Sequence, residues 1–175
     1  MGTLPLHQAK RPRTGLAGPY GHPFHPILIT IPIGAWVASL VFDIASRTVD
    51  DGADLARGAT WLIVIGIIGA LVAAVFGLLD LSVIPRATKA FSTGLLHMSL
   101  NLLVVVLFTV NALIRRDVEG AVELGPIALT VVALAILGAS GWLGGKLAYS
   151  YGVRVADEQN QAEGFVDARK APPKA

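Results

Sequence analysis

The stretch GHPFHPILITIPIG, residues 21–34, places two histidines directly before a long apolar run. His22 and His25 each precede a proline, and a residue in that position is biased away from the α region. Proline is favoured at the first position of a helix, so the sequence predicts an extended lead-in and a helix starting near Pro26. The stretch therefore predicts a pair of imidazoles at the mouth of a membrane-spanning helix.

The composition is that of an integral membrane protein. Of the 175 residues, 54% are hydrophobic and only 15% are charged, whereas soluble domains carry about 25% charged residues. The chain is long enough for four spans of about 20 residues in one domain. It has no cysteine, so a metal or haem would have to be held by His, carboxylate or Met side chains. A soluble enzyme and a nucleic-acid binder are both disfavoured.

We expect an all-α fold: an integral membrane antiparallel four-helix bundle, because the connections between the spans are short. Pro32 lacks an N–H and frees the carbonyl of Leu28, which predicts a kink in the first span. The predicted divisions are a basic tail at 1–20, a transmembrane domain at 21–155 with helices at about 26–46, 60–84, 90–114 and 126–149, and a polar tail at 156–175.

Charge sets the expected orientation. Ten of the 14 lysines and arginines lie on the side of the membrane that holds both tails and the loop between the second and third spans, and the opposite loops are acidic. The positive-inside rule then places both termini in the cytoplasm. We expect a multi-pass protein of the cytoplasmic, or bacterial inner, membrane.

Three of the four spans send titratable side chains to the same half of the membrane: His22, His25, Asp80 and His97. Along the third span Thr93, His97 and Asn101 recur every four residues and so share one face. Polar groups are costly in hydrocarbon, and this face should look into the bundle. The sequence therefore predicts one polar pocket near the cytoplasmic side.

Two cofactors fit such a pocket. One haem b could be held by His97 together with His25 or His22, because imidazoles on facing helices are common haem ligands. Asp80, Asn101 and Thr93 would then lie around the two ligands and orient them without binding the iron. Alternatively, a divalent metal ion could be bound by His22, His25, Asp80 and His97, since imidazole and carboxylate form a plausible ligand set.

A third interpretation needs no cofactor. His97 could hydrogen-bond Asp80 or the carbonyl freed by Pro32, and the cluster would serve helix packing or proton movement. The chain would then be a non-catalytic structural or assembly subunit, or a carrier of protons or small molecules. Pairing of Asp80 with Lys89 or Arg86 near the headgroups is compatible with this interpretation.

Four separated motifs carry a resemblance to a known family: HPFHP (22–26), GLLDLSVIP (77–85), GLLHMSLN (94–101) and GGKLAYSYGVRV (144–155). In this order they resemble the bacterial family of predicted membrane proteins called domain of unknown function 2231, over residues 19–155. The resemblance implies a four-helix membrane domain without an established activity. Some relatives are joined to a Rieske-type iron–sulfur domain, which implies a setting of electron transfer.

The leading expectation is therefore a small membrane protein that binds haem b or a metal and passes electrons without transforming a substrate. Its expected partners are the lipid bilayer and a separate redox protein, since this chain has no cysteine for a cluster of its own. We expect no nucleic acid, and a homo-oligomer is left open.

Overall fold

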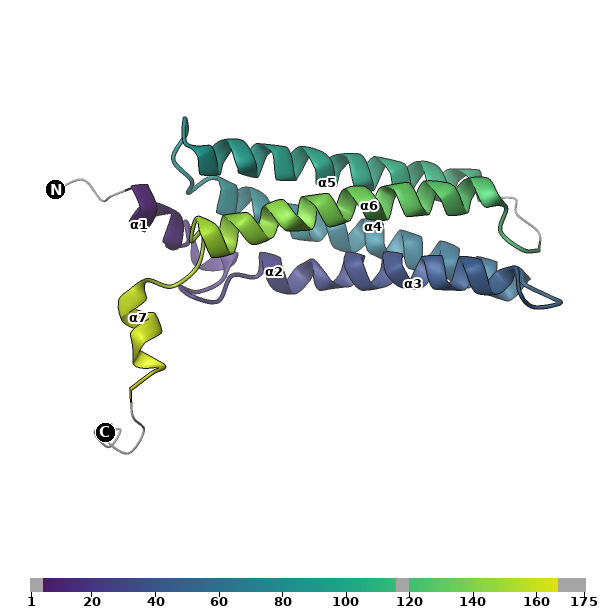
Figure 1. The fold of residues 1–175 in the computed structure, drawn as a ribbon, viewed down its shortest axis with the longest axis horizontal. Coiled ribbons are helices and arrows are strands. Elements are labelled where there is room, and N and C mark those ends of the chain that lie inside the picture. Colours follow the sequence, from purple (N-terminus) through teal and green to yellow (C-terminus); the bar gives the residue numbers. More distant parts are fainter. Residues whose placement is uncertain (1–4, 116–119, 167–175) are drawn as a thin grey trace.

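The computed structural model describes residues 5–115 and 120–166. Its long elements are α3 (Thr30–Ser46), which is preceded by the short α2 (His25–Leu28), then α4 (Ala53–Leu81), α5 (Lys89–Ile114) and α6 (Leu124–Gly145). The last of these continues as one π-helical turn, η2 (Lys146–Ser150). Figure 1 shows these helices running side by side along the long axis. The predicted all-α four-helix bundle is confirmed, and all four helices are long and apolar enough to cross a membrane.

The helix ends differ from the predicted ones where polar residues extend a helix beyond its apolar part. α4 begins at Ala53, not near residue 60, because the Asp51 carboxylate accepts a hydrogen bond from the Ala53 N–H and satisfies one free donor of the first turn. An Asp54–Arg57 ion pair at 3.4 Å lies in the same turn. The break in the first span falls at Ile29, three residues before Pro32, as expected for a residue that cannot donate to the preceding turn.

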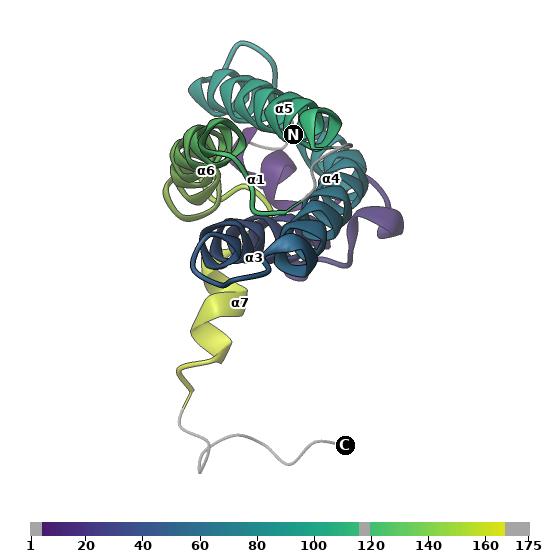
Figure 2. The same ribbon diagram turned by 90° about the vertical axis from the view of Figure 1, so that its right-hand side faces the viewer.

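The bundle is built from two close pairs, α3 with α4 and α5 with α6, which pack less extensively against each other. Figure 2 shows the four helices end on. At the centre the Trp36 and Phe108 rings stack across the pairs with centroids 4.3 Å apart. Trp36 Nε1 donates to the Ile63 carbonyl at 3.2 Å, and Gly66 leaves the space that the indole ring fills. This aromatic stack connects the two pairs.

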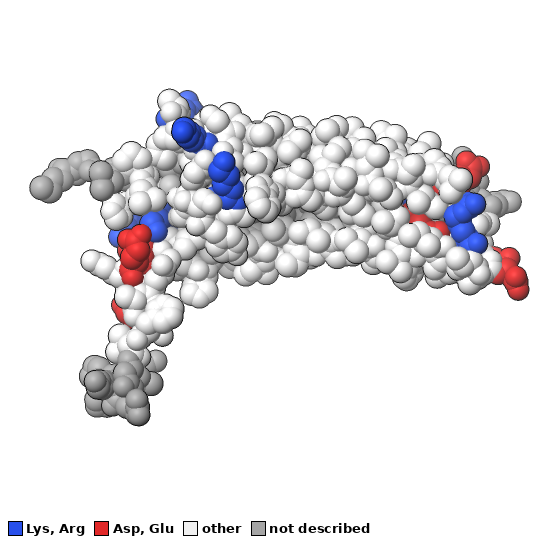
Figure 3. Space-filling model, viewed as in Figure 1, with Lys and Arg blue, Asp and Glu red and all other residues white. Residues whose placement is uncertain are grey.

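The outer surface matches a lipid environment. Large apolar side chains on all four long helices are exposed, among them Val41, Ile68, Leu102 and Val132. In Figure 3 the charged residues gather at the two ends of the bundle, and the surface between them is uncharged. Such an apolar belt is what hydrocarbon requires. The chain is a multi-pass membrane protein.

A buried polar cluster at the end formed by the α3–α4 and α5–α6 connections was not predicted. The Arg115 guanidinium forms two hydrogen bonds of 2.6 Å with the two carboxylate oxygens of Asp43, and both side chains are buried. Asn111 joins the cluster by accepting from Arg115 and by donating to the Pro126 carbonyl at 2.9 Å and the Thr130 hydroxyl at 2.8 Å. We call these five residues the loop-end cluster.

Three short elements lie at the opposite end, which we call the termini end: α1 (Pro5–Lys10), the 3-10 turn η1 (Gly15–Ala17) and α7 (Glu158–Glu163). Residues 1–20 were predicted to form a basic tail, and the structure shows that part of this segment packs on the bundle. Ala9 and Lys10 are buried, and the Ala9 carbonyl accepts from the Arg154 N–H at 3.0 Å. The cytoplasmic location of this end stays a prediction.

Candidate functional site

His25 lies at the first position of α2, where the preceding lead-in turns into the bundle. Its Nδ1 lies 2.9 Å from the Ala73 carbonyl of α4, and its ring packs against Gly77 one turn further on. A Cβ at Gly77 would come within 3.1 Å of the imidazole Cε1. The small-residue face of α4 therefore makes room for the ring, and a backbone carbonyl fixes its orientation.

His97 is held in the same manner on the other helix pair. It lies eight residues into α5, about 12 Å along the helix axis. Its Nδ1 lies 2.8 Å from the Ser140 carbonyl of α6, and its ring packs against Gly144, whose Cβ would come within 3.2 Å of Cε1. The Ser140 hydroxyl lies 3.0 Å from the same nitrogen. Each histidine thus contacts one carbonyl and one glycine of a neighbouring helix.

The two imidazoles lie near each other across the bundle, with ring centroids 6.4 Å apart and ring planes at 88°. A proton on each Nδ1, donated to the carbonyl, leaves Nε2 as the lone-pair nitrogen. Asn101 Nδ2 lies 3.2 Å from His97 Nε2, but its two N–H groups have closer acceptors in the His97 carbonyl at 2.8 Å and the Ser140 hydroxyl at 2.7 Å. Within the described residues this Asn101 contact is the one hydrogen-bond neighbour of either Nε2 atom.

Asp80 pairs with neither Lys89 nor Arg86. Its carboxylate Oδ1 lies 2.7 Å from Arg154 Nε, a charge contact that lacks the alignment of a good hydrogen bond. Arg154 also donates from Nη2 to the Ala17 and Gly18 carbonyls at 3.0 and 3.1 Å. Among the residues that the structure describes, Arg154 Nη1 has no hydrogen-bond partner. Asp80 thus helps join the segment between η2 and α7 (151–157), which we call the C-terminal strap, to α4, close to the face that holds His25.

The remaining predicted site residues lie at different distances from the two imidazoles of His25 and His97. Asn101 belongs to it through Ser140, whereas Thr93 lies one turn before His97 and is half-buried. His22 is exposed, with its Nδ1 3.4 Å from the Tyr20 carbonyl. Within residues 5–115 and 120–166, no three His or acidic side chains gather as a metal site would require. The structure therefore brings together His25 and His97 but not the predicted four-residue set.

Four residues of the site were missed from the sequence: Ser140, Gly77 and Gly144 as neighbours of the imidazoles, and Arg154 as the partner of Asp80. Gly77 lies four residues after Ala73, on the face of α4 that contacts His25. Nothing in the spacing indicates which glycine faces which histidine. Arg154 adopts a positive φ of 61°, which turns the chain back onto the bundle and has no signal in the sequence.

Comparison with known proteins gives one match. The profile of the family described as Predicted membrane protein (DUF2231) matches residues 21–157, a range that includes all four long helices, both imidazoles and Arg154. Neither a curated protein nor a solved structure matches the sequence. The match confirms the resemblance seen in the four motifs: the chain belongs to the DUF2231 family of predicted membrane proteins.

Proposed function

We propose that the bundle binds one haem b, with His25 and His97 as its axial ligands, and that it passes electrons within the bacterial inner membrane. The observation that carries this proposal is the separation and orientation of the two imidazoles. With metal–nitrogen bonds of about 2 Å, two imidazoles on opposite sides of one iron have ring centres about 6 Å apart. The His25 and His97 centroids are 6.4 Å apart.

The number of ligands favours haem over a bare metal ion. A zinc or similar ion needs about four protein or water ligands, and structural sites take all of them from the protein. The porphyrin supplies four nitrogens of its own, so haem iron needs only two axial imidazoles. The described residues offer such a pair, and they include no larger group of His and acidic side chains.

The protein's own contribution is to hold the two imidazoles in one tautomer. A ligating histidine normally donates its other N–H to a carbonyl or carboxylate, which fixes the ring and raises the basicity of the ligating nitrogen. The Ala73 and Ser140 carbonyls are in position to accept these bonds from His25 and His97. Both rings lie between apolar helices and are half-buried. When bound, haem iron supplies one-electron chemistry.

Gly77 and Gly144 support the same proposal, because they leave both rings free to settle against helix backbone. The macrocycle would enter between the α3–α4 and α5–α6 pairs, where packing is less extensive than within each pair. A separate redox protein would complete the electron path, since this chain has no cysteine to hold an iron–sulfur cluster.

The test is the absorption spectrum of the detergent-purified chain from cells supplied with haem precursor. We expect a Soret band and about one haem per chain, lost in His25→Ala and in His97→Ala. His22→Ala is the matched control and should keep the band, because His22 is exposed. No Soret band in the wild-type chain, or an unchanged band in His97→Ala, would refute haem binding, and metal analysis of the same samples would identify a bound ion.

A second candidate is a structural or assembly subunit without a cofactor. It is favoured by the fact that His97, Ser140 and Asn101 already satisfy one another by hydrogen bonds. This alternative predicts that His97→Gln preserves both the fold and any partner binding, and that no cofactor copurifies with the chain.

A further inference from the structure

An open polar cavity lies at the termini end. It has a volume of about 350 Å³ and lies between α1, the turn after η2 and the start of α7. Its wall includes Leu6, Lys10, Tyr149, Tyr151, Glu158 and Gln161. This volume falls within the range of sites that bind small molecules or lipid head groups. π-Helical turns such as η2 are often found beside functional sites.

Lys10 makes this cavity attractive to an anion. Its residue is only 6% exposed, yet its ammonium has a single hydrogen bond within the described part of the chain, to the Ala156 carbonyl at 3.2 Å. An ammonium has three N–H donors, so two are left for a bound group. The Asp157 carboxylate interacts with this ammonium at longer range, but no ion pair to Lys10 forms within the described residues. A phosphate in the cavity would place an opposite charge in direct contact with the ammonium and would offer strong acceptor oxygens.

Glu158 adds the opposite charge to the same wall. It is exposed, and the ion pairs of residues 5–115 and 120–166 include neither Glu158 nor Lys10. A free phosphate would be attracted by Lys10 but repelled by this carboxylate. A group that carries a phosphate and an ammonium a few atoms apart would satisfy both charges. The cavity therefore favours a zwitterionic ligand.

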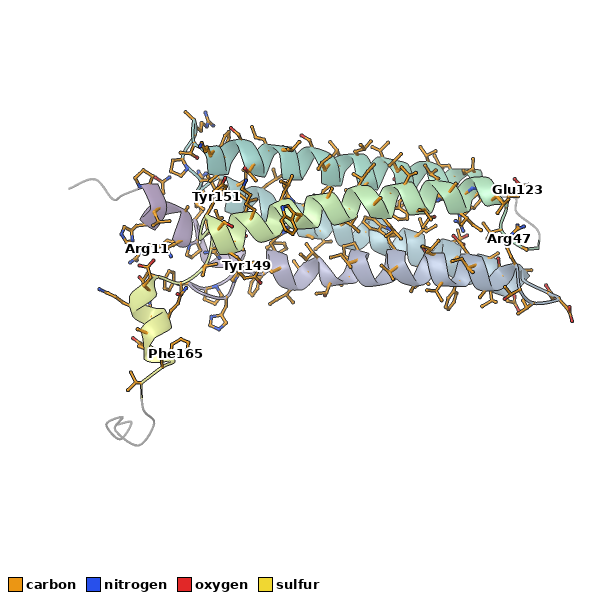
Figure 4. All side chains as sticks on the ribbon, viewed as in Figure 1. Arg11, Arg47, Glu123, Tyr149, Tyr151 and Phe165 are labelled. Carbon is orange, nitrogen blue, oxygen red and sulfur yellow. The ribbon has the colours of Figure 1, made fainter. Side chains whose placement is uncertain are left out.

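The position of the cavity relative to the apolar belt indicates that this ligand comes from the membrane. Tyr149 on its wall is 90% exposed at the end of the apolar belt, where tyrosine is enriched at the interface with the headgroups. Figure 1 shows α7 leaving the bundle across the direction of the long helices, as a segment on a membrane surface would. Phe165, which follows α7 and is labelled in Figure 4, is 91% exposed. The cavity thus opens at the level of the lipid headgroups.

We propose that this cavity binds the head group of a phospholipid that carries both a phosphate and a primary ammonium, with Lys10 at the phosphate and Glu158 at the ammonium. The site is independent of haem binding and would be present in the chain with or without a cofactor.

Native mass spectrometry of the full chain in detergent tests this proposal with three probes: phosphatidylethanolamine, phosphatidylglycerol and inorganic phosphate. The wild-type chain should retain phosphatidylethanolamine most strongly. Lys10→Ala should weaken retention of both lipids about tenfold, because it removes a charge-assisted hydrogen bond. Lys89→Ala is the matched control, since Lys89 is an exposed lysine at the same end of the bundle and should change nothing.

Glu158→Gln gives a second test that does not depend on the packing of α1, because Glu158 is exposed. It should remove the preference for phosphatidylethanolamine over phosphatidylglycerol while leaving both lipids bound. Equal retention of the two lipids by the wild-type chain would overturn the proposal. So would an unchanged preference in Glu158→Gln, or retention of inorganic phosphate without lipid.

Discussion

At the loop end of the bundle Asp43 and Arg115 meet in a two-fold hydrogen-bonded ion pair, whereas at the termini end the His25 and His97 rings lie with their centroids 6.4 Å apart and each contacts a backbone carbonyl. Both arrangements place polar side chains inside a membrane protein. In the loop-end cluster every charge has its partner from the chain. In the imidazole pair each Nδ1 is fixed by a carbonyl, and within the described residues the Nε2 atoms have one polar neighbour, Asn101 Nδ2 at 3.2 Å from that of His97.

This difference distinguishes a stabilising site from the proposed binding site. Fully satisfied buried polar groups rigidify a fold, whereas a ligand needs polar groups that still have bonding capacity to spare. The loop-end cluster also connects the α3, α5 and α6 helices, so its loss should affect the whole bundle. The imidazole pair lies where the two helix pairs pack less extensively.

The largest expected effect comes from breaking the loop-end ion pair. Asp43→Ala leaves the buried Arg115 without its counter-charge and should lower the free energy of unfolding by about 3 to 5 kcal/mol. Reversible unfolding in detergent measures the loss. Asp43→Leu combined with Arg115→Met should recover much of it, because both buried charges are then absent. A loss below about 1 kcal/mol for Asp43→Ala would end the contrast between the two ends.

A substitution at the centre of the bundle, between its two ends, should lower the free energy of unfolding by a smaller amount. The Cβ of Gly66→Ala would overlap the Trp36 indole, so the stacked rings must shift, at a cost of about 1 to 3 kcal/mol. Gly34→Ala in the facing helix is the control, since its Cβ would meet no other atom. The same unfolding measurement should show no loss for Gly34→Ala. Equal effects of the two substitutions would contradict the described packing.

Two neighbouring glycines of α6 sharpen the assignment of the imidazole pair. Gly144→Ala would press on the His97 ring, and an imidazole forced off its rotamer costs about 1 kcal/mol, or severalfold in haem affinity. Gly145→Ala would only reach ordinary contact with Tyr149, at 4.0 Å, and should leave affinity unchanged. Haem titration followed at the Soret band compares the two. The reverse order would place the cofactor elsewhere.

The smallest expected effect lies outside the membrane, at α7. The Asn160 backbone N–H, and then the Tyr20 hydroxyl, hold the pKa of Asp157 below its ordinary value of 3.8. A lowered pKa means that the capping contribution is complete above pH 3.8 and is lost as the pH falls through the folded value. The Asn160 amide resonance in NMR should therefore shift only below about pH 4. Asp157→Asn should show no such shift, and a transition at higher pH would argue against this cap.

The spans were predictable because hydropathy and positive charge act locally along the chain. The sequence also predicts that His25 and His97 lie in the same half of the membrane, on spans that antiparallel packing can bring together, but it leaves open whether His22 or His25 is the partner of His97. Partners that depend on rotation of the helices were not predictable. Arg115 directly follows the predicted third span, and nothing in the order of residues indicates that it turns inward to Asp43.

Similarly, the pairing of Asp80 with Arg154 was not predictable, because it depends on a reversal of the chain at the positive φ angles of Gly152 and Arg154. The packing of the N-terminal segment could not be predicted from its composition either. A basic stretch that contains prolines reads as a solvated tail, yet Lys10 is buried beneath the C-terminal strap.

The electron paramagnetic resonance spectrum of the oxidised, haem-supplied chain tests the central claim most directly, because it reports both axial ligands and the angle between their planes. With the ring planes at 88°, the proposal predicts a strongly anisotropic low-spin ferric signal that disappears in His25→Ala and in His97→Ala. The absence of any haem signal, or a high-spin signal unchanged by His25→Ala, would contradict it.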